Sequence, residues 1–167
     1  TLRREIPYDE LDDDTRLSYD LFALDAQREL DRHTWRFHTY PINQLYGWQS
    51  RIPGFLIGYH AVQSVSDAEA YVQRIHGIRD LLAQVVDGLE VRARRGVVAP
   101  AFVFPKAIAD CRNVLSGRPF DDSGNDSVLL ADFRKKLESL DVEETTRTEL
   151  LARAESVGGV VFTRSPP

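Results

Sequence analysis

The chain has 167 residues, of which 43% are apolar and 28% are charged, and its formal net charge is −5. This length suits a single domain of ordinary size, and the composition is typical of a globular protein. The acidic balance excludes the basic surface on which nucleic-acid binding depends. The longest apolar run, residues 97–104, is too short to cross a bilayer, so the sequence predicts no transmembrane segment.

The sulfur-containing residues limit the covalent chemistry. Cys111 is the only cysteine, which excludes an internal disulfide and a zinc site built from cysteines. The sequence contains no methionine and does not begin with one. We therefore expect it to start within a longer chain, in which case the lack of a leader segment here says nothing about targeting.

The N-terminal part predicts an acidic turn followed by a helix. Residues 8–14 are rich in Asp and Glu, which is typical of a solvated turn with helix-capping residues. A cation site built from the three aspartates at 12–14 is the alternative, but the glycine and the distal glutamate of a calcium loop are absent. The helix is expected to begin near Asp14 or Thr15 and to end before Pro41. Its apolar stripe consists of Leu17, Leu21, Leu24 and Leu30.

The next segment is rich in aromatic residues. Residues 35–60 hold seven of them, including both tryptophans, but show no lasting helical or strand period. Prolines and glycines interrupt the segment at Pro41, Gly47, Pro53 and Gly54. We expect an irregular segment with so many large rings to pack between helices or to line a cleft.

The clearest predicted element is a long helix over about residues 67–95. Ser66 and Glu69 form a capping box at its start, and Gly96 is the expected C-cap. Apolar residues recur along it at spacings of four and three, as on a packed helix. They are Tyr71, Ile75, Ile78, Leu82, Val85 and Leu89. A coiled-coil dimer through this seam is the alternative to packing within a bundle.

Three further helices are predicted. The first starts at Pro105 and ends at Gly117, and its stripe consists of Phe104, Ile108, Cys111 and Leu115. Residues 117–127 are a possible linker. The second helix carries Leu129, Phe133, Leu137 and Leu140. The third is capped by Asp141 with Glu144, ends at Gly158 and Gly159, and carries Leu150, Leu151 and Ala154. Residues 160–167 are assigned to no element.

The predicted fold is therefore all-α. It is an irregular bundle of about five or six helices, with one long helix and the aromatic-rich irregular segment 35–60. Residues 1–167 form either a single helical domain or the N-terminal fragment of a larger helical protein.

The common catalytic motifs are absent. The sequence has no HExxH, no phosphate-binding glycine loop and no GxSxG. His33, His38, His60 and His76 are not spaced as two ligands on one helical face, so structural or surface roles are expected for them. Cys111 is expected to be a buried small hydrophobe and not a nucleophile. No catalytic residue, metal ligand or cofactor is assigned within this chain.

Polar groups within the aromatic segment are open to two interpretations. They are Asn43, Gln44, Gln49, Tyr59 and His60. The amides either satisfy backbone groups of an irregular buried stretch, or grip a peptide-like ligand between Tyr and Trp walls. Arg36 and Arg51 among the aromatics would suit single-stranded nucleic acid, but two arginines in an acidic chain are too few.

Five runs in the first two thirds of the chain carry a resemblance to a known family. They are LSYDLF at 17–22, YPINQ at 40–44, IPGFLIGYH at 52–60, DAEAYV at 67–72 and RGVVAPAFV at 95–103. In this order the runs resemble the N-terminal region of a bacterial family known as domain of unknown function 885. The resemblance covers about Thr15 to Leu115 and is expected to fade beyond Leu115.

The resemblance implies a largely helical zinc metallopeptidase-like protein of several hundred residues. Its zinc ligands would lie in a C-terminal half that this chain lacks. The N-terminal helices would form one wall or a lid of the substrate cleft, with Asn43, Gln44, Tyr59 and His60 nearest the substrate. Secretion and lipoprotein signals in the family imply a periplasmic or cell-envelope location, with the cytoplasm as the alternative.

The leading interpretation is thus a non-catalytic, cleft-forming part of a zinc-dependent peptidase-like protein. Its partners would be the remainder of the parent chain and a peptide substrate, and zinc would be held only by the parent. The alternative is a self-contained helical binding or protein-interaction module.

Overall fold

The computed structural model describes the backbone of residues 5–163 and the side chains of residues 5–159. It contains six α-helices and one short 3-10 helix, and none of the described residues forms a strand. The predicted all-α fold of five or six helices is confirmed. The chain divides into two compact units, the first ending at Thr39 and the second beginning at Tyr40, and each is described by itself.

The first unit contains the 3-10 helix η1 (Tyr8–Glu10) and helix α2 (Asp13–Thr34). The Asp12 carboxylate caps α2 by accepting the backbone N–H of Thr15 at 2.8 Å. Arg16 donates to the backbone oxygens of Tyr8 and Asp9, which holds η1 against the first turns of α2. The acidic run is therefore a turn and a cap, as predicted. The helix starts earlier than expected and ends at Thr34, well before Pro41.

None of the described residues of the first unit covers the apolar stripe of α2. None of its residues is buried, and Leu17, Leu21 and Leu24 are about half exposed or more (60%, 54% and 46%). An isolated helix of 22 residues gains little stability from propensity alone. By itself α2 is therefore only marginally stable.

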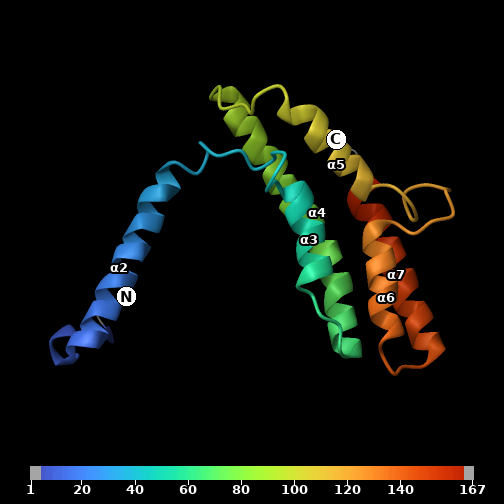
Figure 1. The fold of residues 1–167 in the computed structure, drawn as a ribbon, viewed down its shortest axis with the longest axis horizontal. Helices are drawn as coiled ribbons and strands as arrows, with labels where there is room; N and C mark the ends of the chain where they lie inside the picture. The colour runs from blue at the N-terminus through green and yellow to red at the C-terminus, as the bar shows by residue number, and fades with distance from the viewer. Residues whose placement is uncertain (1–4, 164–167) are drawn as a thin grey trace. The chain divides into compact units, whose positions relative to one another are not determined.

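The second unit holds the other five helices, α3 to α7 (Figure 1). It also holds the hydrophobic core. The helices are α3 (Trp48–Gly58), α4 (Val65–Arg94), α5 (Val103–Val114), α6 (Val128–Glu138) and α7 (Glu144–Thr163). Helix α4 packs along α7, α7 packs on α6, and α3 contacts both α5 and α6. Tyr71 of α4 and Phe133 of α6 stack at the centre, with 4.6 Å between ring centroids and no exposed surface on either.

The predicted core residues of α4, α6 and α7 are confirmed. Tyr71, Ile75, Ile78 and Val85 are buried on α4, and Leu82 and Leu89 are half-buried. On the last two helices the buried predicted residues are Leu129, Phe133, Leu137, Leu150 and Ala154, and the predicted Leu140 is buried just after α6. The spacing of four and three therefore identified the face of each helix that meets its neighbours.

The predicted start of α4 is wrong by two residues. Its cap is Ser64, whose Oγ accepts the backbone N–H of Asp67 at 3.2 Å. The Asp67 carboxylate in turn accepts the backbone N–H of Gln63, so Ser64 and Asp67 form the capping box in place of Ser66 and Glu69. At the other end, Gly96 follows the helix with a φ of +72°, as expected of a C-cap glycine.

The predicted buried stripe of α5 is also wrong. Phe104 and Ile108 are 46% and 48% exposed, and Cys111 is exposed. The buried residues of α5 are Val103 and Ala107. The described residues of the second unit leave the larger apolar stripe of α5 uncovered.

Helix α7 does not end at Gly158 and Gly159 but continues through them to Thr163. It begins at Glu144, so the expected cap at Asp141 lies three residues before it. The predicted unassigned tail is therefore helical up to residue 163, and residues 164–167 lie outside the described residues.

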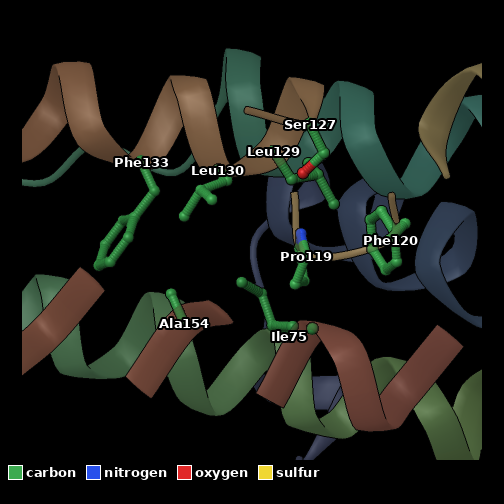
Figure 2. Close-up of a pocket in the computed structure, with 9 residues that line it drawn as sticks. Ile75, Pro119, Phe120, Ser127, Leu129, Leu130, Phe133 and Ala154 are labelled. Carbon is green, nitrogen blue, oxygen red and sulfur yellow. The ribbon is translucent and has the colours of Figure 1, made fainter. Parts of the chain in front are cut away.

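Residues 117–127 fold into an ordered loop against the core. Arg118 and Asp126 form an isolated bridge, and Ser127 is only 2% exposed. A mainly apolar cavity of about 20 Å³ lies beneath this loop. Figure 2 shows Pro119 and Phe120 at one end of it and Ile75 and Ala154 along one side. This volume corresponds to about one water molecule, so the cavity is a packing gap and not a ligand site.

Candidate functional site

The aromatic segment is irregular only in part. Its second half forms helix α3, which begins after Gly47 and contains Pro53. The segment had no visible period because α3 covers only eleven residues and is interrupted by proline and glycine. The part that precedes α3, residues 40–47, is a series of turns.

Asn43 holds this turn region together. Its Nδ2 donates to the backbone oxygen of Tyr40 at 3.0 Å. Its Oδ1 accepts the backbone N–H groups of Leu45 and Tyr46 at 2.9 and 2.8 Å. The amide thus satisfies backbone groups of the turn, which is the first of the two interpretations of this residue. Gln44, the next residue, is half-buried.

Gln49 fixes the same turn from the first turn of α3. Its side chain is buried, and its Nε2 donates to the backbone oxygen of Asn43 and, at 3.5 Å, to the carboxylate of Asp110 on α5. A Cβ on Gly47 would lie 1.9 Å from Oε1 of Gln49. Gly47 is therefore required for this close approach.

One face of α3 presents a row of aromatic and basic side chains, of which the first is half-buried and the other three are exposed. Trp48, Arg51, Phe55 and Tyr59 follow one another at spacings of three, four and four, which places them on one side of the helix. We call this row the α3 face. Its rings are ordered by contacts with arginines: the Arg51 guanidinium lies 4.7 Å from the Trp48 ring, and that of Arg74 lies 5.8 Å from the Phe55 ring.

The α3 face is open and carries little negative charge. Tyr59 is 84% exposed and stacks on Phe55 with 6.5 Å between ring centroids. Helix α3 contains no Asp or Glu. An aromatic surface with guanidinium groups can bind flat peptide groups through the rings and carbonyl or carboxylate oxygens through the arginines. Of this row, Tyr59 stays a predicted substrate contact, whereas Trp48 and Phe55 were not predicted individually although their helical spacing is visible.

His60 lies behind this face and not on it. Only 5% of the residue is exposed, and its ring lies 5.0 Å from that of Tyr71. Burial lowers the pKa of His60, with the neighbouring Arg74 and Lys136 adding to the effect. The ring is therefore neutral near pH 7 and belongs to the core of the α3–α4 junction.

A network of charged groups joins the end of α3 to α4 and α6. Lys136 donates to the last carbonyls of α3, those of Leu56 and Ile57, at 2.6 and 3.1 Å. It also pairs with Asp132 at 2.8 Å. The Tyr71 hydroxyl donates to Asp132 at 3.1 Å, and burial raises the pKa of Tyr71. A lysine at a helix C-terminus opposes the helix dipole, so this network fixes the end of α3.

The structure does not gather the four predicted substrate-contacting residues at one point. Asn43 and Gln44 precede α3, whereas Tyr59 and His60 follow it. The eleven residues of α3 separate the two pairs by about 16 Å at 1.5 Å per residue. Of these residues, Tyr59 is the one that belongs to the α3 face.

Within the described part of the chain, no group of three or more His, Cys, Asp or Glu residues could hold a metal ion. Cys111 is exposed on α5, and partial desolvation raises the pKa of its thiol, so it is not an activated nucleophile. None of the described helices is both long and apolar enough to cross a membrane.

A family model described as a bacterial protein of unknown function, DUF885, matches residues 1–159. The chain belongs to the DUF885 family. The match continues well past Leu115, where the resemblance was expected to fade, so the DUF885 region includes α6 and most of α7. No curated protein and no solved structure matches the chain.

Proposed function

We propose that this DUF885 chain is the N-terminal helical, cleft-forming part of a zinc-dependent peptidase-like protein and is not catalytic by itself. In this proposal the zinc ion, its activated water and the general base belong to the remainder of a longer parent chain. The chain itself contributes one wall of the substrate cleft. The observation that carries the proposal is the α3 face, an ordered and mostly exposed row of aromatic and basic side chains.

The chemistry of the α3 face suits a peptide. Phe55 and Tyr59 form a continuous pair of rings on which an extended peptide can lie. Arg51 supplies donors for peptide carbonyls or a terminal carboxylate, and its position over Trp48 limits the side-chain entropy lost on binding. The half-buried network at Lys136 and Asp132 holds the end of the helix in place, as a binding surface requires.

The uncovered apolar stripes support a place within a larger protein. Phe104, Ile108 and Leu115 form an exposed row along α5, and α2 exposes Leu17 and Leu21. Large exposed apolar surfaces typically mark interfaces. In this proposal the remainder of the parent chain covers them.

Kinetics of the full-length parent test the proposal. We expect Tyr59→Ala and Phe55→Ala to raise KM for a quenched fluorescent peptide library about tenfold, because one lost stacking contact costs about 1–1.5 kcal/mol. Both residues are exposed, so the melting temperature should change little. Val86→Ala on α4, which removes an apolar side chain of similar exposure, is the control and should leave KM unchanged. An unchanged KM in both variants would show that the α3 face does not contact the peptide substrate.

A second candidate function is a self-contained helical interaction module. It is favoured by the second unit, whose core of residues from α3, α4, α6 and α7 is closed around Tyr71 and Phe133. A cooperative melt of the monomeric 167-residue chain, without binding of a dye for exposed apolar surface, would support this module. Strong dye binding or aggregation would favour a part severed from a larger core.

A further inference from the structure

The connection between α3 and α4 is built around His60. This residue follows Tyr59, the C-cap of α3, and lies in the short connection over residues 59–64. Its Nε2 is 3.1 Å from the backbone oxygen of Asp67, and its Nδ1 is 2.7 Å from Nη1 of Arg74. Both ring nitrogens therefore have a partner on α4.

These contacts favour the neutral ring. A backbone oxygen can only accept, so Nε2 carries the hydrogen. Nη1 of Arg74 lies 2.7 Å from Nδ1 and 3.1 Å from Nε2, which places the guanidinium over the ring and not along the lone pair of Nδ1. Protonation of Nδ1 would therefore place a second positive charge 2.7 Å from a nitrogen of Arg74.

The other charged groups near His60 do not offset this conflict. Lys136 on α6 adds a second cation, although Asp132 pairs with it at 2.8 Å. The Asp67 carboxylate favours a charged ring, but it already accepts hydrogen bonds from Gln63 and Ser64. Burial disfavours the charge further. The pKa of His60 is accordingly lowered, and burial is the largest cause.

We propose that His60 is an acid-sensitive latch, which holds residues 59–64 and the end of α3 against α4 while its ring is neutral and releases them when the ring is protonated. The amide of Gln63 donates to the Asp67 carboxylate of α4, so its exchange reports whether residues 59–64 stay against α4. This inference does not depend on the proposed function.

The direction of the pH effect follows from linkage. The neutral ring belongs to the closed form, whereas a released histidine has a pKa near 6.5. Below that pH the open form binds more protons than the closed form, so acidification favours opening. At pH 5.5 a released group of this pKa is about 90% protonated, which limits the increase in opening to about tenfold.

Amide hydrogen exchange of the 167-residue chain at pH 7.5 and 5.5, corrected for intrinsic rates, tests the latch. We expect the protection of residues 60–63 to fall several-fold at pH 5.5, while the amides of α7 keep theirs. His60→Gln should reduce the change to less than about twofold, because glutamine supplies a donor and an acceptor but does not titrate. His76→Gln, at an exposed position on α4, is the matched control and should keep the full response.

Two results would overturn the latch: a full pH response in His60→Gln, or an equal loss of protection in α7. Arg74→Gln provides a second test if His60→Gln does not fold. Removing the guanidinium should raise the pKa of His60, as followed by NMR, because protonation no longer sets two cations together. An unchanged pKa in Arg74→Gln would contradict the role given to Arg74.

Discussion

Gly158 offers the sharpest test of the fold, because the sequence and the structure predict effects of opposite sign for one substitution. A glycine that ends a helix adopts a positive φ, and Gly→Ala at such a position destabilises. In the structure Gly158 lies inside α7, and among the described residues positive φ angles occur only at Gly96, Gly117 and Gly124. Gly158→Ala should therefore stabilise the protein.

The magnitude follows from two contributions. Replacing glycine by alanine inside a helix is worth about 0.5–1 kcal/mol. The added Cβ would lie 3.7 Å from Cγ of Pro119, an ordinary contact, and would occupy part of the small cavity beneath the 117–127 loop. Burial of one methyl group adds up to about 0.8 kcal/mol. The expected gain is about 1–1.5 kcal/mol, or roughly 2–5 °C in melting temperature.

Thermal and urea unfolding of the 167-residue chain measure this effect, with Gly117→Ala as the contrasting variant. Gly117 has a φ of +85°, and a Cβ there would lie 2.6 Å from the backbone nitrogen of Ser127, so Gly117→Ala should destabilise. A loss of stability in Gly158→Ala would refute the continuous α7 and restore a helix end at Gly158.

The remaining predictions concern the turn, the core and one ion pair. Asn43→Ala should lower the free energy of unfolding by about 1–2 kcal/mol, because three turn hydrogen bonds are lost. Gln44→Ala should change it by no more than about 0.5 kcal/mol, and equal losses in the two variants would contradict the role of Asn43 in the turn. Phe133→Ala should cost about 3–5 kcal/mol, but Ile108→Ala within about 0.5 kcal/mol, since only Phe133 is fully buried. The pKa of the Asp126 carboxyl is held below its usual value, chiefly by the hydrogen bond from Arg134 on α6. The contribution of this ion pair to the free energy of unfolding is therefore present above about pH 4 and is lost as the pH falls further. Asp126→Asn should therefore lower stability at pH 7 and make little difference at pH 2.5, and a pH-independent difference in unfolding free energy would argue against the ion pair.

The sequence predicted those parts of the fold in which one face of a helix is buried. The seam of Tyr71, Ile75 and Ile78 is visible because α4 meets its neighbours along a single face. Helix α5 has apolar residues on two faces, and spacing alone favoured the larger ones. Only the tertiary structure shows that the smaller residues Val103 and Ala107 are the buried ones.

The candidate site was harder to predict for a related reason. Asn43 and His60 stand out in the sequence because they are polar among aromatics, but hydrogen bonds within the fold explain both. The row at Trp48 and Phe55 was hidden because Pro53 argued against a helix there. The two ends of α3 are nevertheless held by hydrogen bonds: Gln49 in its first turn donates to the backbone oxygen of Asn43, and Lys136 of α6 donates to the carbonyl of Leu56.

The central claim is that these 167 residues shape a substrate cleft while the metal chemistry lies elsewhere in the parent. Metal analysis combined with a peptide-cleavage assay tests this claim most directly. Both would be applied to the purified chain and to the full-length protein. The proposal predicts far less than one zinc per molecule and no cleavage for the chain alone, with one zinc and chelator-sensitive cleavage for the parent. One tightly held zinc on the isolated chain, or cleavage by it that a chelator abolishes, would contradict the claim.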